Sequence, residues 1–319
     1  MSAAVPTSPP SRACRVLFGG SSASLDLSDG ILALRVALPV LEGAAAERLL
    51  SDAAAPETRE GWTLFQHGLW LAGFAVAAPG EDIEAAAGGL YRGLFEAAEG
   101  LHLYRVWNYV PQINAVARDM DNYQRFCRRR SIAFEERFGR GFQRALPASS
   151  AVGSAAGPLA IGFLAGRAVP RHFENPRQVP AFEYPAQYGP RPPSFSRATA
   201  VKAGEGRWIF ISGTAAIRGH ASVAGGDLAG QLDCTLENLL LVGETAGAGP
   251  DLGASAGWQR AFKVYLRNPA DLPCAQTRLN RGLLRSGDTV SYLQADICRK
   301  DLLVEIEGTL TFFAKGAPA

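Results

Sequence analysis

Apolar residues alternate with loop-forming segments along most of the chain, which is typical of a mixed α+β protein. Helical spacing of apolar residues predicts helices at 82–98, 120–138, 227–247 and 272–284. Asp227 stands where a helix N-cap is expected and Gly247 where a C-cap is expected. Strands are predicted at 15–18, 31–38, 62–65, 69–76, 101–110, 149–153, 159–165, 207–213, 261–266, 290–298 and 302–313.

The order of predicted elements repeats. YRVWNYV, a helix, PASSAVG and PLAIGFLAG in the first part parallel FKVYLRN, a helix, TVSYLQAD and DLLVEIEG in the second. Such self-similarity favours two copies of one α+β unit packed together. We therefore predict an N-terminal half at 13–165 and a C-terminal half at 196–319, preceded by a disordered, Pro/Ser/Ala-rich N-terminus at 1–12.

A proline-rich connector at 166–195 joins the two predicted halves. Seven prolines fall from Pro170 to Pro193, in PRHFENPRQVPAFEYPAQYGPRPPSF. Prolines at this density exclude central strands and helix interiors, so the segment is expected to be extended. Its tyrosines and arginines make it a candidate lid over a site, and the alternative is a plain linker.

Two carboxylates interrupt the apolar run of the last strand, Leu302–Leu310. Because side chains alternate between the faces of a strand, Glu305 and Glu307 share one face. The corresponding segment of the first half, Leu159–Gly162, has no carboxylate. The pair therefore marks either a site in the second half or an exposed edge strand.

Composition and charge exclude several classes of protein. The 319 residues are 47% hydrophobic and 19% charged, with a formal net charge of +2, so the chain can bury a large core. No basic run is interleaved with aromatic residues, which argues against nucleic-acid binding. The densest basic cluster, at 125–130, is either a solvated helix face or an anion site.

The sequence gives no sign of a membrane segment, an export signal or a metal site. It lacks a run of about 18 apolar residues and a basic segment followed by an apolar one, so we expect a cytoplasmic protein. The cysteines show no CxxC spacing and no histidines at ligand distance, which predicts reduced thiols and no metal. They are Cys14, Cys127, Cys234, Cys274 and Cys298.

Specific motifs carry a family resemblance. Residues 196–313 resemble the RidA/YjgF family in IFISGTAAI, FKVYLRNPADL and DLLVEIEGT. From about residue 60 onward the chain is more similar to the chorismatases, in YRVWNYVPQIN, PASSAVG, the proline-rich connector and YLQADICRKDLLVEIEG. Thr289–Ser291 stands where plain RidA proteins carry a substrate-binding arginine, which argues against RidA-type imine deamination.

The resemblance implies a fold of two RidA/YjgF-like, chorismate-mutase-like halves and a cofactor-free site formed mainly by the second half. It also implies conversion of chorismate to 3-hydroxybenzoate and pyruvate, with Glu305 protonating the enolpyruvyl group. Cys298, which from sequence alone would be core packing on the strand beside Glu305, and Gly213 match the 3-hydroxybenzoate-forming branch. The alternatives are a dihydrodiol-forming or 4-hydroxybenzoate-forming chorismatase, and a RidA-like binding module or imine deaminase.

The two carboxylates of chorismate require cationic and hydroxyl donors. His220 is expected to be structural, and the assembly a monomer or a small homo-oligomer. Each candidate donor alone could equally be a surface or packing residue. The candidates are Arg130, Arg197, Arg278, Tyr184, Tyr188 and Tyr265.

Overall fold

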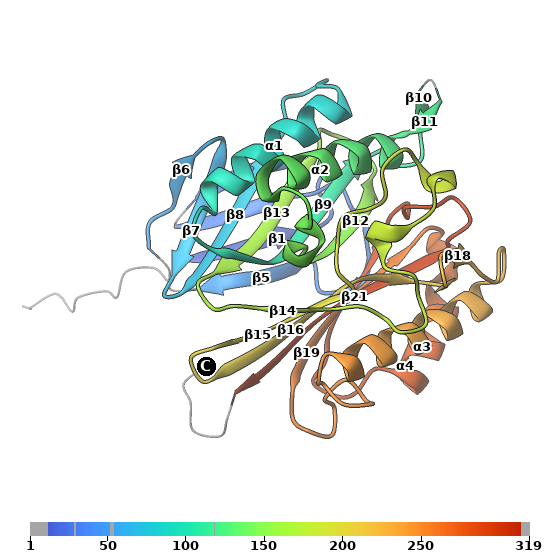
Figure 1. Cartoon of the computed structure of the whole chain (residues 1–319). Coiled ribbons are helices and arrows are strands. Elements are labelled where there is room, and N and C mark those ends of the chain that lie inside the picture. The colour runs from blue at the N-terminus through green and yellow to red at the C-terminus, as the bar shows by residue number, and fades with distance from the viewer. Residues whose placement is uncertain (1–11, 29, 52–53, 118, 314–319) are drawn as a thin grey trace, which may run out of the picture.

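Two β-sheets pack face to face, and each carries a pair of helices on its outer face (Figure 1). The structure is a computed structural model that describes residues 12–28, 30–51, 54–117 and 119–313. The N-terminus predicted to be disordered, 1–12, lies outside the described residues except for Arg12.

The first sheet has six strands, in the order β12-β9-β13-β8-β7-β6. Helices α1 and α2 cover its outer face and pack on it through a core that includes Tyr91, Phe126 and Phe134 (Figure 1). The strands are β6 (Glu57–Arg59), β7 (Trp62–His67), β8 (Trp70–Val76), β9 (His102–Pro111), β12 (Ala148–Ser154) and β13 (Ala160–Gly166), and the helices are α1 (Ile83–Ala97) and α2 (Asn122–Phe138).

The second sheet has seven strands, in the order β14-β15-β16-β21-β19-β20-β4. Helices α3 and α4 cover its outer face (Figure 1). The strands are β14 (Arg171–Phe173), β15 (Ala198–Ala203), β16 (Gly206–Ala215), β21 (Val304–Phe313), β19 (Gln259–Leu266), β20 (Thr289–Gln294) and β4 (Val40–Gly43), and the helices are α3 (Leu228–Thr245) and α4 (Leu272–Gly282).

The predicted duplication is confirmed by the topology. The order β12-β9-β13-β8-β7 in the first sheet matches β20-β19-β21-β16-β15 in the second, with helices inserted at the same places. In each copy the strands that flank the second helix are parallel, β9 with β12 and β19 with β20. The fold is thus the predicted α+β arrangement of two related halves.

A separate N-terminal sheet adds to both copies. Its order is β2-β3-β1-β5, and the neighbouring strand β4 pairs with β20 at the edge of the second sheet. Val16 and Leu34 of this sheet share one core with the facing surfaces of the two large sheets. The strands are β1 (Ala13–Leu17), β2 (Ser24–Ser28), β3 (Ile31–Arg35) and β5 (Ala46–Ser51).

Local sequence explains where the helices of the first half begin. The Asp82 side chain accepts hydrogen bonds from the backbone N–H groups of Glu84 and Ala85, at 3.0 and 3.3 Å. Asp121 and Gln124 form a capping box at the start of α2, in which each side chain accepts from the other's backbone N–H. This box fixes the first turn of α2, beside the cavity described below.

The connector runs along the junction of the two halves. It contains β14, two single-turn 3-10 helices, η2 (Ala181–Glu183) and η3 (Ala186–Tyr188), and a bridge from Gln178 to Gly219. The remaining short elements are β10 (Val116–Ala117), β11 (Met120–Asp121), β17 (Ile217–Arg218), β18 (Ala221–Ser222), η1 (Phe142–Ala145) and η4 (Pro269–Asp271).

Two predicted boundaries in the second half were wrong. The strand predicted at 290–298 ends at Gln294, because Asp296 forms a bridge to Gly153 of the first half instead. Arg267 holds the following segment by donating to the backbone carbonyls of Ile297 and Arg299. Asp227 does occupy the N-cap of α3 but makes no side-chain cap bond, and the C-cap is Ala246 rather than Gly247.

Candidate active site

A cavity of about 200 Å³ opens at the junction of the two halves. The first half contributes α2 and β12, the second half contributes β16 and β21, and the connector forms another wall. The lining residues are Asp121, Tyr123, Gln124, Arg130, Ser149, Ser150, Ala151, Tyr184, Gln187, Tyr188, Pro193, Phe195, Arg197, Gly213, Ala215, Ile217, Cys298, Arg299, Lys300 and Glu305. A site of this composition depends on both halves and on the segment that joins them.

Glu305 reaches this cavity through an irregularity in the second sheet. The pairing of β16 with β21 shifts between Ile211 and Thr214, which places Gly213 in a bulge, while Glu305 pairs with Ala215. A Cβ built on Gly213 would lie 2.0 Å from Oε1 of Glu305. The carboxyl group therefore occupies space that any other residue at 213 would fill.

The Glu305 carboxyl is held in its neutral form. The residue is 4% exposed, and burial followed by the nearby charge of Glu307 raises its pKa to about 8. Arg105 and Arg197 act in the opposite direction and do not overcome these effects. Near neutral pH Glu305 thus carries a proton that it can donate.

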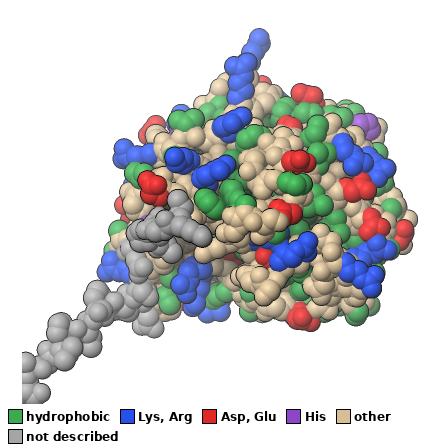
Figure 2. All heavy atoms as spheres, turned by 90° about the horizontal axis from the view of Figure 1, so that it is seen from below, with side chains coloured by type: hydrophobic (Ala, Val, Ile, Leu, Met, Phe, Trp, Pro, Cys, Tyr) green, Lys and Arg blue, Asp and Glu red, His purple; other side chains and the backbone are tan. Residues whose placement is uncertain are grey.

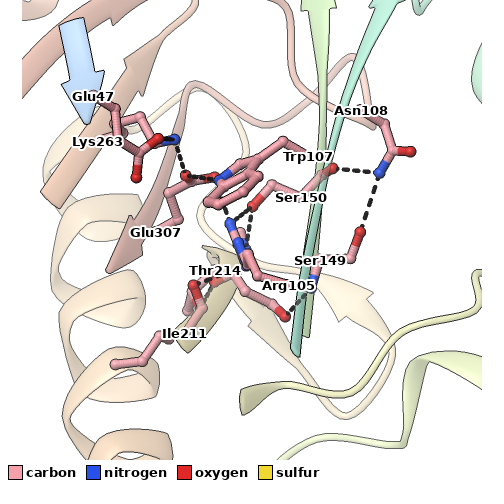
Figure 3. Close-up of polar contacts among 12 residues, drawn as sticks. Glu47, Arg105, Trp107, Asn108, Ser149, Ser150, Ile211, Thr214, Lys263 and Glu307 are labelled. Atoms are coloured by element: carbon pink, nitrogen blue, oxygen red, sulfur yellow. Dashed lines mark hydrogen bonds and ion pairs between the residues drawn. The ribbon is translucent and has the colours of Figure 1, made fainter. Parts of the chain in front are cut away.

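Glu307, two residues after Glu305 on β21, is surrounded by cations (Figure 3) and remains ionised. Lys263 Nζ lies 2.5 Å from Glu307 Oε1, and Arg105 Nη2 lies 2.8 Å from Oε2. Trp107 Nε1 donates to the same carboxylate at 2.9 Å. Burial alone would raise the pKa of Glu307, but Lys263 and Arg105 outweigh it and lower the pKa.

Ser150 connects this ion cluster to the bulge (Figure 3). Its Oγ accepts hydrogen bonds from Arg105 Nη2 at 2.5 Å and from the backbone N–H of Gly213 at 2.9 Å. Arg105 also donates to the carbonyl of Ile211, at 3.1 Å. The first half thus fixes the bulged backbone on which the position of Glu305 depends.

Cys298 lines the cavity in the segment after β20, not on the strand itself as predicted. Burial, followed by the charge of Glu305, raises the pKa of the Cys298 thiol to about 12. The thiol is therefore neutral and presents a small, weakly polar surface beside the acid.

Arg130 is a buried cation with unused hydrogen-bond donors. It is 2% exposed, and its guanidinium lies 5.3 Å from the ring centre of Tyr91 and 5.9 Å from that of Phe126. Its Nε and Nη2 have no hydrogen-bond partner. Since buried donors are normally satisfied, this arginine is suited to an anion in the cavity.

A second arginine of the cavity, Arg197, lies just after the connector. Arg197 Nη2 donates to the Tyr184 hydroxyl at 2.8 Å, and its guanidinium lies over the Phe195 ring. Tyr188 is hydrogen-bonded to Nδ1 of His220 at 3.1 Å. The structure thus brings Arg130, Arg197, Tyr184 and Tyr188 to one cavity, and gives His220 a contact that orients Tyr188.

Two of the candidate donors lie elsewhere. Arg278 is on the outer face of α4, where it pairs with Asp233 of α3. Basic and acidic side chains are interspersed on the face seen from below in Figure 2. Tyr265 is fully buried between the sheets, where burial and then the charge of Glu307 raise its pKa well above the usual value. Neither residue lines the cavity, so their assignment as substrate-binding residues is not supported by their placement.

The sequence interpretation missed several cavity residues. Arg299 lies over the Tyr188 ring at 3.9 Å and donates to Ser222 Oγ at 3.1 Å, and Lys300 follows it. The signal was present, because both follow Cys298 directly in ICRKD. Ser150 had no such signal, because its role depends on contact with the other half.

Two further observations concern the described residues only. None of their helices is long and apolar enough to cross a membrane. No group of three or more His, Cys, Asp or Glu side chains among them is arranged to hold a metal ion.

The fold and the cavity define a protein in which two related α+β halves jointly bury a protonated carboxylic acid. Comparison with known proteins identifies its family. Residues 50–165 match the family model described as "Chorismatase FkbO/Hyg5-like, N-terminal". The chain also resembles a crystal structure of a chorismatase, with a TM-score of 0.83 and 30% identity over 97% of this chain and 95% of that one.

Two curated relatives agree with this result. A 3-hydroxybenzoate synthase from Streptomyces hygroscopicus is 41% identical over 65% of this chain and 63% of its own length. A chorismatase from Streptomyces rapamycinicus is 38% identical over 76% of this chain and 74% of its own length. The chain belongs to the chorismatase family, as the resemblance predicted.

The raised pKa of Glu305 predicts a pH-dependent stability. Between about pH 4.5 and 8 the folded state keeps a proton that the unfolded state has lost, so the free energy of unfolding falls as pH rises through this window. Glu305→Gln removes this contribution. The stability of the wild type relative to this variant should fall by roughly 4 kcal/mol between pH 4.5 and 8, as measured by urea unfolding. Parallel pH profiles for the two proteins would contradict the assignment.

Glu307 is predicted to hold the two halves together. Glu307→Gln leaves Arg105 and Lys263 buried with less negative charge beside them, which should lower the free energy of unfolding by about 3–5 kcal/mol. The control is Glu237→Gln, which removes an exposed partner of Arg177 and Arg218 and should cost at most about 1 kcal/mol. Equal losses in the two variants would show that the buried cluster is not a major source of stability.

Proposed function

We propose that this protein converts chorismate to 3-hydroxybenzoate and pyruvate without a cofactor. The observation that carries the proposal is the buried Glu305, whose raised pKa keeps it protonated at the wall of a cavity lined by arginines. A carboxylic acid can protonate carbon near neutral pH only if its pKa is raised in this way.

The first step is proton transfer to the enolpyruvyl group. Glu305 donates its proton to the methylene carbon of that group, and an oxocarbenium ion forms on the side chain. The ionised Glu307 lies nearby on the same strand, and its fixed negative charge favours the positive charge that develops. The Glu305 carboxylate left by the transfer then stabilises the same cation at shorter range.

The second step releases pyruvate. The C4 hydroxyl oxygen bonds to C3 as the C3–O bond of the side chain breaks, and the electron pair of that bond completes the ketone of pyruvate. The hydroxyl proton returns to Glu305. The C4–O bond of the arene oxide then breaks, and loss of the C3 hydrogen as a proton, with protonation of the oxygen, gives 3-hydroxybenzoate. The products together contain the atoms of chorismate, so no water is consumed.

Cys298 and Gly213 are proposed to select this product. Gly213 leaves the space that the Glu305 carboxyl occupies, and the neutral thiol of Cys298 lines the wall beside it. Neither Gly213 nor Cys298 adds a charged or strongly hydrogen-bonding side chain that would hold a competing water beside the acid. Attack by the substrate's own hydroxyl is therefore favoured over hydrolysis.

Arg130 and Arg197 are proposed to bind the two substrate carboxylates. Arg130 has two buried donors free for this purpose, and Arg197 lines the same cavity. Tyr184 orients Arg197 by its hydrogen bond, and Tyr188 lies under the guanidinium of Arg299. Arg278 and Tyr265 are not part of this proposal.

Release of pyruvate tests the proposal directly. Addition of chorismate to the wild-type protein should produce pyruvate, measured by coupling to lactate dehydrogenase, and 3-hydroxybenzoate, identified by chromatography. Glu305→Gln should lower kcat by at least about 10²-fold, because it cannot donate the proton. The exposed control, Glu205→Gln, should retain full activity. Absence of pyruvate with the wild type would rule out every chorismatase reaction.

The identity of the product tests the assignment of Cys298. Cys298→Ala removes the sulfur beside Glu305 and leaves room for water, so part of the product should become the dihydroxy-cyclohexadiene acid. The fraction of 3-hydroxybenzoate, measured by chromatography, should fall several-fold while pyruvate release continues. Cys274→Ala, an exposed cysteine outside the cavity, should leave the product unchanged. An unchanged product from Cys298→Ala would remove Cys298 from the set that selects the product.

A further inference from the structure

Glu174 is a buried acid next to the cavity, and the mechanism above gives it no role. It follows β14 directly, at the start of the connector. About 28% of its side chain is exposed, yet both carboxylate oxygens are buried and neither has a hydrogen-bond partner. Buried carboxylate oxygens without donors are unusual, so their surroundings need an explanation.

Arg197 is the cation that faces this acid. Its Nε lies 3.8 Å from Oε2 of Glu174 and has no hydrogen-bond partner of its own. Nη2 of the same guanidinium donates to Tyr184 and to the carbonyl of Val179. Arg197 therefore lies between the Glu174 carboxylate on one side and the cavity on the other.

The surroundings of Glu174 raise its pKa into the physiological pH range. Burial raises the pKa of Glu174 to about 7, although the charge of Arg197 opposes the shift. Glu183 of η2 also faces it and adds to the increase. On β14 itself, burial and the charge of His102 lower the pKa of His172 to about 4, so His172 is neutral near pH 7.

We propose that Glu174 is a positioning residue that sets, through Arg197, how strongly the site binds the carboxylate of its substrate. When Glu174 is neutral, the full charge of Arg197 is available to the ligand. When Glu174 is ionised, it competes for the same guanidinium and repels the dianionic substrate. The inference rests on the proposed function, because it takes chorismate as the dianion that is bound.

Ionisation of Glu174 and binding of the substrate must affect each other in this arrangement. If ionisation of Glu174 weakens binding of the dianion, binding of the dianion must also favour the protonated form of Glu174. Substrate binding near pH 7 is therefore accompanied by proton uptake. The affinity of the enzyme for substrate falls as pH rises through this range, and the chemical step at Glu305 is not directly involved.

The test compares KM for chorismate in the wild type and in Glu174→Gln between pH 6 and 8. The ratio of wild-type to variant KM should be close to one at pH 6, where Gln resembles the protonated acid. It should rise on the order of 3- to 10-fold by pH 8. Because Glu305 titrates in both proteins, its effect on KM cancels in this ratio. The kcat values of the two proteins should agree within about twofold.

Two variants separate this role from a structural one. Glu205→Gln removes the same charge from an exposed position that does not contribute to the pKa shift of Glu174, and should give a ratio that does not change with pH. Glu174→Asp keeps an ionisable carboxyl, so its KM should depend on pH as that of the wild type does. A ratio for Glu174→Gln that is constant with pH, or a change in kcat alone, overturns the proposal. Absence of pyruvate from the wild type instead overturns the proposed function, and this inference with it.

Discussion

The fixed negative charge of Glu307 is the constraint on which the rest of the site depends. Its carboxylate is held by Arg105 from the first half and Lys263 from the second, so one buried ion cluster joins the two copies of the fold. The same charge raises the proton affinity of Glu305 on the same strand. Stability at the junction and acidity at the cavity therefore have a common origin, and a change at either cation would affect both.

The two copies of the fold differ at the positions of the two acids. Arg105 and Lys263 occupy equivalent positions on β9 and β19. They lie opposite Leu164 and Glu307 respectively on the neighbouring strands. Gly162 stands where the second copy has Glu305, and the Phe74 ring packs against it. The first copy keeps a cation and an apolar strand, and the second supplies both carboxylates. The fold itself does not require acids at these positions.

The sequence predicted most elements because their patterns are local. The period of two along 302–313 placed Glu305 and Glu307 on one face, and the strand is central rather than an exposed edge. The bulge at Gly213 could not be predicted, because it depends on Ser150 from the other half. Arg278 and Tyr265 were chosen by residue type, which does not indicate where a side chain points in the folded protein. Arg278 points outward from its helix and Tyr265 lies between the sheets. Residue type also gave no means of finding Glu174, whose environment is made entirely by tertiary contacts.

The segment from Asp296 to Arg299 has no regular secondary structure, yet it is tightly held. Arg267 binds the side chain of Asp296 and the backbone carbonyls of Ile297 and Arg299. Asp296 is also bridged to Gly153 of the first half. Apart from the contact to Asp296, these anchors use main-chain atoms, which every residue possesses. The side chain at 298 can therefore be exchanged while the loop keeps its shape, so under the role proposed for Cys298 a single substitution there changes the product without rebuilding the enzyme.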